Sequence, residues 1–265
     1  MNPILNGAPW LIAHRSMLGI NRPLKITLSG EGKGEPLAKK LELIVRDDLI
    51  WTYGNLAPRL PIPDLISQRI KEMKYLGVSG DSSIKAQFID CIRINYDFNH
   101  QNGVHRDNFR IVANPVKTFE TDGYYAKVVQ TFLRAKNTLA EISQNPALLI
   151  LPQEISNELE YSFPSTTLFK AQLPLGEVLQ FFILYPETEK RTRTFVLSYA
   201  SWKSPLLKVP GIKNIIEKSL VESAAKIVEQ DSSNVESLYP RQKPKIRLPK
   251  EEIMSYVEKI YHNWE

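Results

Sequence analysis

A series of long alternating segments, followed by one long amphipathic helix, constrains this chain more than any other feature of its sequence. Between about residues 107 and 201, apolar and polar residues alternate in the segments YYAKVVQTFLR, LEYSFPSTTLFKAQL, VLQFFILYP and TRTFVLSYASW. Such segments, joined by short turns, are typical of antiparallel strands. Residues 212–238 then place apolar residues at every third or fourth position, as expected for a helix that packs on a sheet. The chain is therefore predicted to be α+β, with one curved antiparallel sheet and the long helix packed across it.

Several smaller elements are predicted around this sheet. They are a strand over 23–28, a hairpin over 41–53 turned at Arg46-Asp47-Asp48, a helix near 65–73, a helix near 135–143 and a last helix from Pro249. The last helix has an apolar face formed by Ile253, Val257, Ile260 and Trp264. Between the strand and the hairpin, the segment Gly30–Pro36 contains three glycines, which indicates a flexible joint.

Composition and charge argue against several classes of protein. Lys and Arg total 34 against 29 Asp and Glu, and no block of five basic residues occurs, so nucleic-acid binding is not expected. No run of about 18 apolar residues is present, so no membrane-spanning helix is expected. The N-terminus lacks the features of a signal peptide. We therefore expect a soluble protein of the cytoplasm.

The chain contains a single cysteine, Cys91. One cysteine cannot form a disulfide within the chain, a zinc finger or a cysteine-ligated iron–sulfur cluster. Cys91 is therefore expected to fill space in the core.

Two of the four histidines lie five residues apart in a D-x-x-H-x-x-x-x-H segment formed by Asp97, His100 and His105. The spacing of three between Asp97 and His100 would place both on one face of a helix. On a regular helix, however, His100 and His105 point roughly 140° apart. They converge on one ion only if the helix ends or opens between them, and Gly103 is a candidate break. Two imidazoles suit iron, copper, nickel or zinc, with a third ligand from elsewhere.

The long helix contains a candidate for that third ligand. Asp231 falls on the stripe of residues that otherwise faces the core. A buried lone carboxylate is unfavourable unless it is paired or bound to a cation. Two histidines and one carboxylate form the facial triad of non-heme Fe(II) oxygenases, which leaves positions open for O2.

Simpler interpretations of the same residues remain open. A pair of histidines in a polar stretch is more often exposed or hydrogen-bonded than bound to a metal. The segment from Gln230 to Asn234 also resembles a turn, and on that interpretation the helix ends near Glu229 and Asp231 is solvated. His14 and His262 are interpreted as surface residues without a role.

The histidine segment, together with the later segment EQDSSNVES over 229–237, resembles the catalytic domain of Rieske non-heme iron oxygenases, also called aromatic-ring-hydroxylating dioxygenase α subunits. The resemblance covers about residues 85–265. It implies a helix-grip fold, similar to START-like domains, and a mononuclear Fe(II) site with His100, His105 and Asp231 as ligands.

The resemblance also implies a role for Asp97, which matches the aspartate that bridges an incoming electron to a ligand histidine. The family often has an asparagine three positions before that aspartate. This chain has Ile94 there, with Asn95 one position away.

The resemblance extends weakly to the N-terminus. Residues 23–30 and 41–53 resemble the opening and the close of the family's electron-transfer domain, which carries C-x-H and C-x-x-H ligands for a [2Fe–2S] cluster between them. Here the segment Gly30–Pro36 stands in that place. We therefore expect residues 1–60 to be a remnant of that domain without cluster ligands, and residues 61–265 to be the mononuclear-iron catalytic domain.

The resulting hypothesis is a domain that binds Fe(II), activates O2 and oxidises a small hydrophobic or aromatic substrate. Because the chain cannot hold the cluster, its electrons would come from an external donor, such as a ferredoxin and reductase or a cluster-bearing partner. The family also implies a homotrimer. The substrate pocket is expected between the sheet and the long helix, and nearby aromatic residues are interpreted as core rather than as substrate contacts. These aromatic residues are Phe132, Phe181, Phe182 and Tyr199.

The main alternative is a non-catalytic, START-like subunit that binds a small molecule or serves in assembly. A hydrolase with a zinc-like site is a weaker interpretation, because the chain has neither an H-E-x-x-H motif nor a G-x-S-x-G motif.

Overall fold

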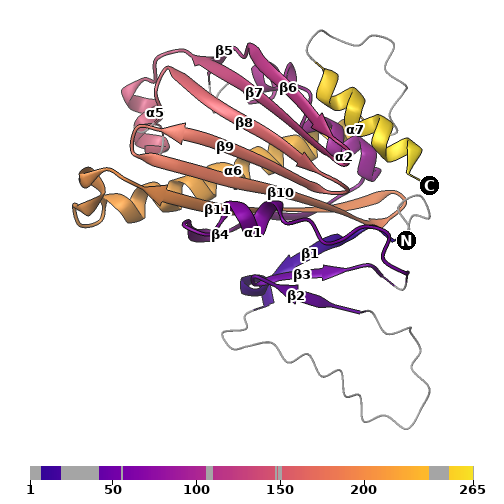
Figure 1. Cartoon of the computed structure of the whole chain (residues 1–265). Helices are drawn as coiled ribbons and strands as arrows, with labels where there is room; N and C mark the ends of the chain where they lie inside the picture. Colours follow the sequence, from indigo (N-terminus) through magenta and orange to yellow (C-terminus); the bar gives the residue numbers. More distant parts are fainter. Residues whose placement is uncertain are drawn as a thin grey trace.

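A large antiparallel sheet forms the centre of the molecule (Figure 1). The computed structural model describes residues 7–18, 42–54, 56–105, 110–146, 148, 151–238 and 251–264. Within these ranges the sheet has eight strands in the order β4-β11-β10-β9-β8-β7-β5, with β6 also paired to β7. The strands are β4 (Lys74–Ile84), β5 (Ile111–Ala113), β6 (Val116–Asp122), β7 (Tyr125–Arg134), β8 (Glu154–Ser162), β9 (Thr166–Leu173), β10 (Gly176–Thr188) and β11 (Arg191–Trp202). From β7 to β11 each strand pairs with the next in sequence, as the alternating segments predict.

A smaller sheet of the order β1-β3-β2 packs beside the large one. Its strands are β1 (Trp10–His14), β2 (Ile44–Arg46) and β3 (Leu49–Thr52). The predicted hairpin is confirmed, and its turn residues Asp47 and Asp48 both have positive φ, as two-residue hairpin turns require. The strand expected over 23–28 and the glycine-rich joint at 30–36 lie outside the described residues.

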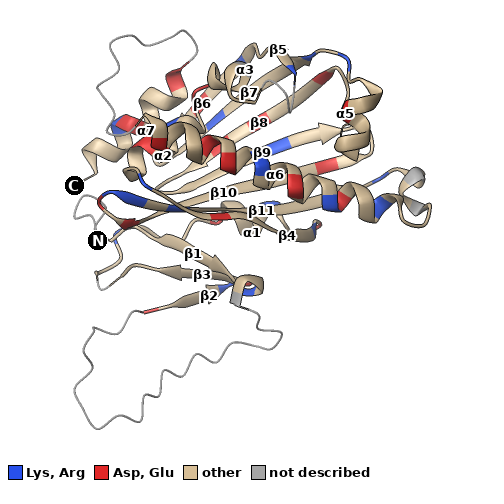
Figure 2. Ribbon diagram, turned by 180° about the vertical axis from the view of Figure 1, so that it is seen from behind, with Lys and Arg blue, Asp and Glu red and all other residues tan. Residues whose placement is uncertain are grey.

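Helices cover one face of the large sheet. The long helix α6 (Ile212–Ser237) runs across that face, and α2 (Phe88–Ile94) contacts both α6 and α7 (Glu252–Asn263) on the same side (Figure 2). The shorter helices are α1 (Leu65–Arg69), α3 (His100–Gly103), α5 (Leu139–Gln144) and the 3-10 helices η2 (Arg15–Leu18) and η4 (Pro205–Lys208). The predicted α+β helix-grip architecture is confirmed. None of the helices in the described part of the chain combines the length and apolar character needed to cross a bilayer.

Two of the predicted helices have other end residues in the structure than the sequence predicts. The helix expected near 135–143 begins only at Leu139, because Thr138 and Glu141 form a capping box that fixes its N-terminus. The helix expected near 65–73 ends after Arg69. By contrast, α6 continues through Gln230–Asn234, so the interpretation that it ends near Glu229 is wrong.

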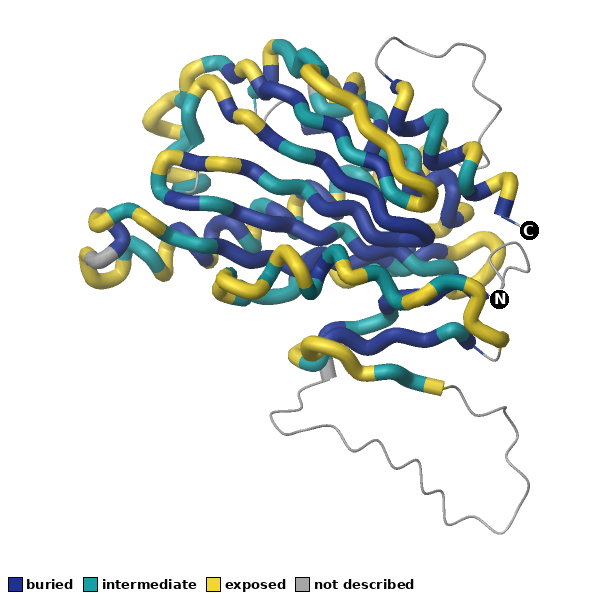
Figure 3. The backbone as a smooth tube through the Cα atoms, viewed as in Figure 1, coloured by how far each residue is buried: buried dark blue, intermediate teal, exposed yellow. Residues whose placement is uncertain are grey.

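The central strands are buried on both faces (Figure 3). On β10, Leu179, Phe181 and Ile183 pack against residues of the small sheet such as Leu11 and Trp51. The intervening positions on β10 point to the opposite face, which carries α6. Because both faces are covered, apolar residues in these strands belong to two separate cores.

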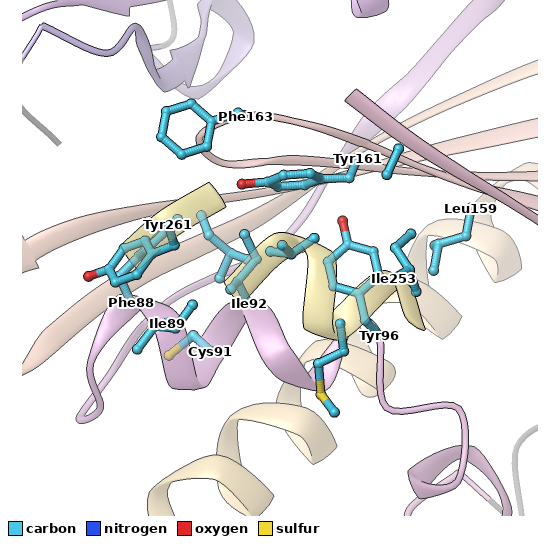
Figure 4. Close-up of a cluster of buried hydrophobic side chains, with 14 of the residues drawn as sticks. Phe88, Ile89, Cys91, Ile92, Tyr96, Leu159, Tyr161, Phe163, Ile253 and Tyr261 are labelled. Atoms are coloured by element: carbon cyan, nitrogen blue, oxygen red, sulfur yellow. The ribbon is translucent and has the colours of Figure 1, made fainter. Parts of the chain in front are cut away.

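A second core fixes the segment that precedes the histidines. Figure 4 shows Phe88, Ile92 and Tyr96 in one apolar cluster with Tyr161 of β8 and with Phe163, which follows that strand. The same cluster includes Ile253 and Tyr261 of α7. Arg93 of α2 forms ion pairs with Asp90, at 2.6 Å, and with Glu258 of α7. The apolar face predicted for the last helix is confirmed, since Ile253 and Val257 are buried and Trp264 packs there as well. Helix α7 therefore holds α2 in place.

Gly80 allows α6 to approach β4 closely. Its φ is +65°, and a Cβ atom built there would lie 2.7 Å from Cβ of Val228 on α6. The register between β4 and β11 shifts at this point, between the pairs Thr194–Ser82 and Val196–Ser79. Val228 lies one helical turn before Asp231, so this contact sets the position of that carboxylate relative to the sheet.

Replacing Gly80 with alanine is expected to lower the free energy of unfolding by about 2–4 kcal/mol, because the substitution adds both left-handed backbone strain and overlap with Val228. Gly123→Ala is the matched control, since Gly123 also has positive φ, +53°, but no atom lies within 4 Å of its added Cβ. We expect about 1–2 kcal/mol there. Equal losses in guanidinium unfolding would contradict the close-packing argument.

Candidate metal centre

His100, His105 and Asp231 converge at one point although they come from distant parts of the chain. Nε2 of His105 lies 2.9 Å from Asp231 Oδ1, and Nε2 of His100 lies 3.4 Å from the same oxygen. One nitrogen or oxygen from each of the three side chains lies within 4.8 Å of the others. Helix α3 ends at Gly103, between the two histidines, so a regular helix no longer forces their side chains apart. The expected break is therefore confirmed.

Asp97 lies in the turn between α2 and α3 rather than on a helix face with His100, so that expectation was wrong. Its carboxylate oxygen Oδ1 accepts hydrogen bonds from the backbone N–H groups of Asn99, at 3.0 Å, and His100, at 3.2 Å. Its backbone carbonyl contacts Nδ1 of His100. A spacing of three residues is also that of a capped turn, which explains the difference. Asp97 thus orients His100 through the main chain.

Gln230 orients the second histidine. Its side-chain oxygen Oε1 lies 2.9 Å from Nδ1 of His105. A carbonyl oxygen can only accept a hydrogen bond, so Nδ1 is the donor of each ring on that side, and Nε2 of each ring faces Asp231. This arrangement is the one that metal-ligating histidines use. Gln230 was not predicted from the sequence, because its position beside Asp231 does not reveal a contact made 125 residues away.

The three side chains are buried and electrostatically coupled. The side chains of His100, His105 and Asp231 are 8%, 3% and 14% exposed. Burial acts to raise the pKa of the Asp231 carboxyl group, but the two imidazoles more than offset this and hold it below its usual range. Burial likewise acts to lower the pKa of His100. The carboxylate of Asp231 and the backbone carbonyl of Asp97 outweigh this effect, so the pKa of His100 lies above its ordinary value. The interpretation of Asp231 as a solvated residue is wrong.

One feature distinguishes this cluster from an ordinary buried hydrogen-bond network. Oδ1 of Asp231 is buried and faces both Nε2 atoms. Within the described ranges, however, no group is placed so that it donates a well-formed hydrogen bond to this oxygen. Buried acceptors normally have a donor. Two imidazole nitrogens and a carboxylate oxygen gathered at a common point are a ligand set suited to a divalent transition metal.

The cluster opens into a cavity between the sheet and α6. This metal-side chamber has a volume of about 70 Å³ and is lined by the three clustered residues, aromatic side chains such as Phe132, Phe169 and Phe182, and a few polar groups. A second chamber, also of about 70 Å³, adjoins it and shares Phe132, Phe169, Gln180 and Ile227. We call it the inner chamber.

The four aromatic residues considered from the sequence fall into two groups. Phe132 and Phe182 line the metal-side chamber, so a role in substrate contact is open to them. Phe181 and Tyr199 lie on the opposite face of the sheet, in the core beneath the small sheet. Because both faces of these strands are apolar, the sequence could not distinguish the two groups.

The remaining histidines lie outside the cluster. His262 is exposed, as expected. His14 is only 6% exposed, so its interpretation as a surface residue was wrong. Its ring stacks on Tyr75 with the ring centres 4.3 Å apart, and Nδ1 lies 2.8 Å from Ser16 Oγ. The small sheet buries it against β4, which local sequence does not predict.

Comparison with solved structures identifies the fold. The chain is similar to dicamba monooxygenase bound to dicamba, with 16% identity, 84% of this chain and 69% of that chain covered, and a TM-score of 0.64. A structure of dicamba monooxygenase with non-heme iron and dicamba also has 16% identity, with 83% and 68% covered and a TM-score of 0.55. Pseudomonas putida CBB5 NdmA with caffeine has 13% identity, with 86% and 64% covered and a TM-score of 0.53. At these identities the similarity establishes a shared fold. A scan against protein-family models and a search of curated proteins found no match.

Cys91 lies close to the cluster, since it and Asp231 line the same small cavity, but its chemistry does not suit a ligand. Burial raises the pKa of its thiol to about 12, so only about one molecule in ten thousand carries a thiolate at pH 8. We expect no reaction of the folded protein with a disulfide reagent such as DTNB at pH 8 within an hour, and one equivalent in 6 M guanidinium. Rapid labelling of the folded protein would show that the thiol is accessible and reactive.

Proposed function

We propose that this chain is the catalytic domain of a non-heme iron oxygenase, which binds one Fe(II) through His100, His105 and Asp231 and uses O2 to oxidise a small apolar or aromatic molecule. The observation that carries the proposal is the convergence of two oriented Nε2 atoms on a largely buried carboxylate at the wall of a cavity. A cavity with few polar groups and one reactive cluster is the usual form of a small-molecule site.

The residues fit a metal ion better than they fit a purely structural role. A histidine–aspartate pair serving only stability needs one imidazole, whereas here two imidazoles face the same oxygen. Both are fixed from behind by carbonyl oxygens, of Asp97 and of Gln230. Such support orients ligands and raises their basicity. Two nitrogens and one oxygen also match the facial triad of non-heme iron oxygenases.

The contribution of the protein to the reaction follows from this arrangement. A bound Fe(II) ion supplies the redox chemistry for O2. The Asp97 carbonyl and the Gln230 amide keep the two imidazoles directed inward. The apolar side chains of Phe132, Phe169 and Phe182 hold the substrate beside the cluster and exclude water.

The structural neighbours support this proposal at the level of the fold. One is a monooxygenase whose structure holds non-heme iron and dicamba, and another was solved with caffeine. Both structures carry small ring compounds, and we propose a small ring compound as the substrate class here. The resemblance of the histidine segment to Rieske oxygenases points to the same chemistry independently of the fold.

We propose that electrons reach this centre from another molecule. The 265 residues contain one cysteine, whereas a Rieske cluster takes two cysteines and two histidines. The donor would be a ferredoxin and reductase or a cluster-bearing partner, and Asp97 would lie on the electron route to His100. In this proposal residues 1–60 are a remnant of the electron-transfer domain, residues 61–265 form the catalytic domain, and a homotrimer is the assembly.

The metal assignment is tested by the stoichiometry of bound iron. After anaerobic reconstitution with Fe(II), we expect one iron and no sulfide per chain. Asp231→Ala and His100→Ala should each abolish stoichiometric iron, because each removes a ligand. His262→Ala changes an exposed histidine and should leave it intact. Equal iron retention in all three variants would overturn the site, and no iron in the wild type would favour the START-like binding or assembly role.

Gln230→Leu tests the orientation of His105. We expect the affinity for Fe(II) to fall about 10–100-fold, because the imidazole loses the acceptor that fixes its Nδ1 proton. Glu229→Gln is the matched control, since Glu229 is the exposed neighbour on the same helix. Competitive chelator titration measures both affinities. Unchanged affinity in Gln230→Leu would show that the amide does not orient the ligand.

A further inference from the structure

Gln180 lies where the two chambers meet. It is a β10 residue opposite Phe169 in the strand register, and it lines both the metal-side chamber and the inner chamber. It is only 8% exposed. Within the part of the chain that the structure describes, its amide makes no hydrogen bond to another residue, although an amide offers two donors and an acceptor.

Two other polar residues that line the chambers are already engaged. Thr167 Oγ1 lies 2.7 Å from Tyr96 Oη, and Asn145 accepts from Ser219 and donates to Ser223. These bonds hold the walls of the cavity together. Gln180 differs, because its polar atoms contribute nothing to the wall. A largely buried amide that faces both chambers is available to a molecule bound there.

The size of the chambers limits what could supply that partner. Each has a volume of about 70 Å³, and a cavity of ~150 Å³ accommodates benzene. Phe132, Phe169 and Ile227 form the shared wall on either side of Gln180. A molecule that reaches into both chambers is therefore about the size of one small ring compound, and it passes Gln180.

The amide also indicates the chemistry of a substituent on such a molecule. It is uncharged, and it can both donate and accept a hydrogen bond. A hydroxyl, carbonyl, carboxamide or carboxylate group satisfies it, and the inner chamber is also lined by Arg134 and Lys226.

We propose that Gln180 determines substrate specificity, and that the substrate is a single-ring apolar molecule with one hydrogen-bonding substituent. Identification of this ligand as the substrate rests on the proposed function, whereas the binding preference does not. The hydrogen bond to Gln180 holds the ring across both chambers, so that one end faces His100, His105 and Asp231.

The test compares the binding of benzamide and toluene to the protein without added metal, by ligand-observed NMR titration. In the wild type, Gln180 favours benzamide. Gln180→Leu should lower the benzamide-to-toluene affinity ratio about 10-fold, the value of one hydrogen bond. Gln172→Leu is the matched control, because Gln172 is an exposed glutamine on the adjacent strand β9, and it should leave the ratio unchanged. An unchanged ratio in Gln180→Leu would overturn the proposal.

Stability distinguishes a ligand contact from a structural one. Gln180→Leu and Gln180→Met remove a buried amide that has no partner, so we expect Tm to be unchanged or raised by about 2–4 °C. A fall in Tm in both variants would show that the amide is structural and would overturn the proposal.

The same measurements separate this inference from the proposed function. If the wild type takes up no iron but the Gln180-dependent ratio persists, the oxygenase assignment fails and the binding preference stands. If iron binds stoichiometrically and the ratio does not depend on Gln180, the specificity assignment fails and the metal centre stands.

Discussion

The burial of one carboxylate on α6 is the constraint on which much of the structure depends. Asp231 lies on the buried stripe of the helix, between Val228 and Val235, where a lone charge would be strongly unfavourable. The charge of Asp231 is compensated by the imidazoles of His100 and His105, which belong to a different segment. The histidine segment and α6 must therefore be held in one relative position. Gly80 admits α6 close to the sheet, and the core between α2 and α7 fixes the chain that leads to the histidines.

Much of this architecture could be predicted from local patterns. The apolar stripe of α6 continues past Gln230 to Val235, and this period predicted both the length of the helix and the inward direction of Asp231. Alternation predicted the antiparallel strands, and the Asp47-Asp48 turn predicted the hairpin. The break at Gly103 followed from geometry on the condition that both histidines bind one ion, because two histidines five residues apart cannot converge on an intact helix. These signals are periodic or confined to a few neighbouring residues.

What the sequence could not predict depends on tertiary contacts. Asp97 and His100 have a spacing shared by helices and capped turns, and only the structure shows the turn. Phe181 and Phe182 are equally apolar neighbours, and burial of the sheet on both faces hides which of them points to the cavity. Gln230 and Gln180 have no distinguishing pattern at all, because an amide acquires its role from the groups that happen to face it.

The histidines and the aspartate belong to segments separated by strands β5 to β11. Two imidazoles alone are present before α6 docks, and the full donor set exists only when the sheet between them has folded. An ion that binds all three side chains therefore binds the native state and not the unfolded chain, and it stabilises the whole domain in proportion to its concentration and affinity. Occupancy of this small centre and the cooperativity of the entire fold are thus thermodynamically linked, so that loss of either weakens the other.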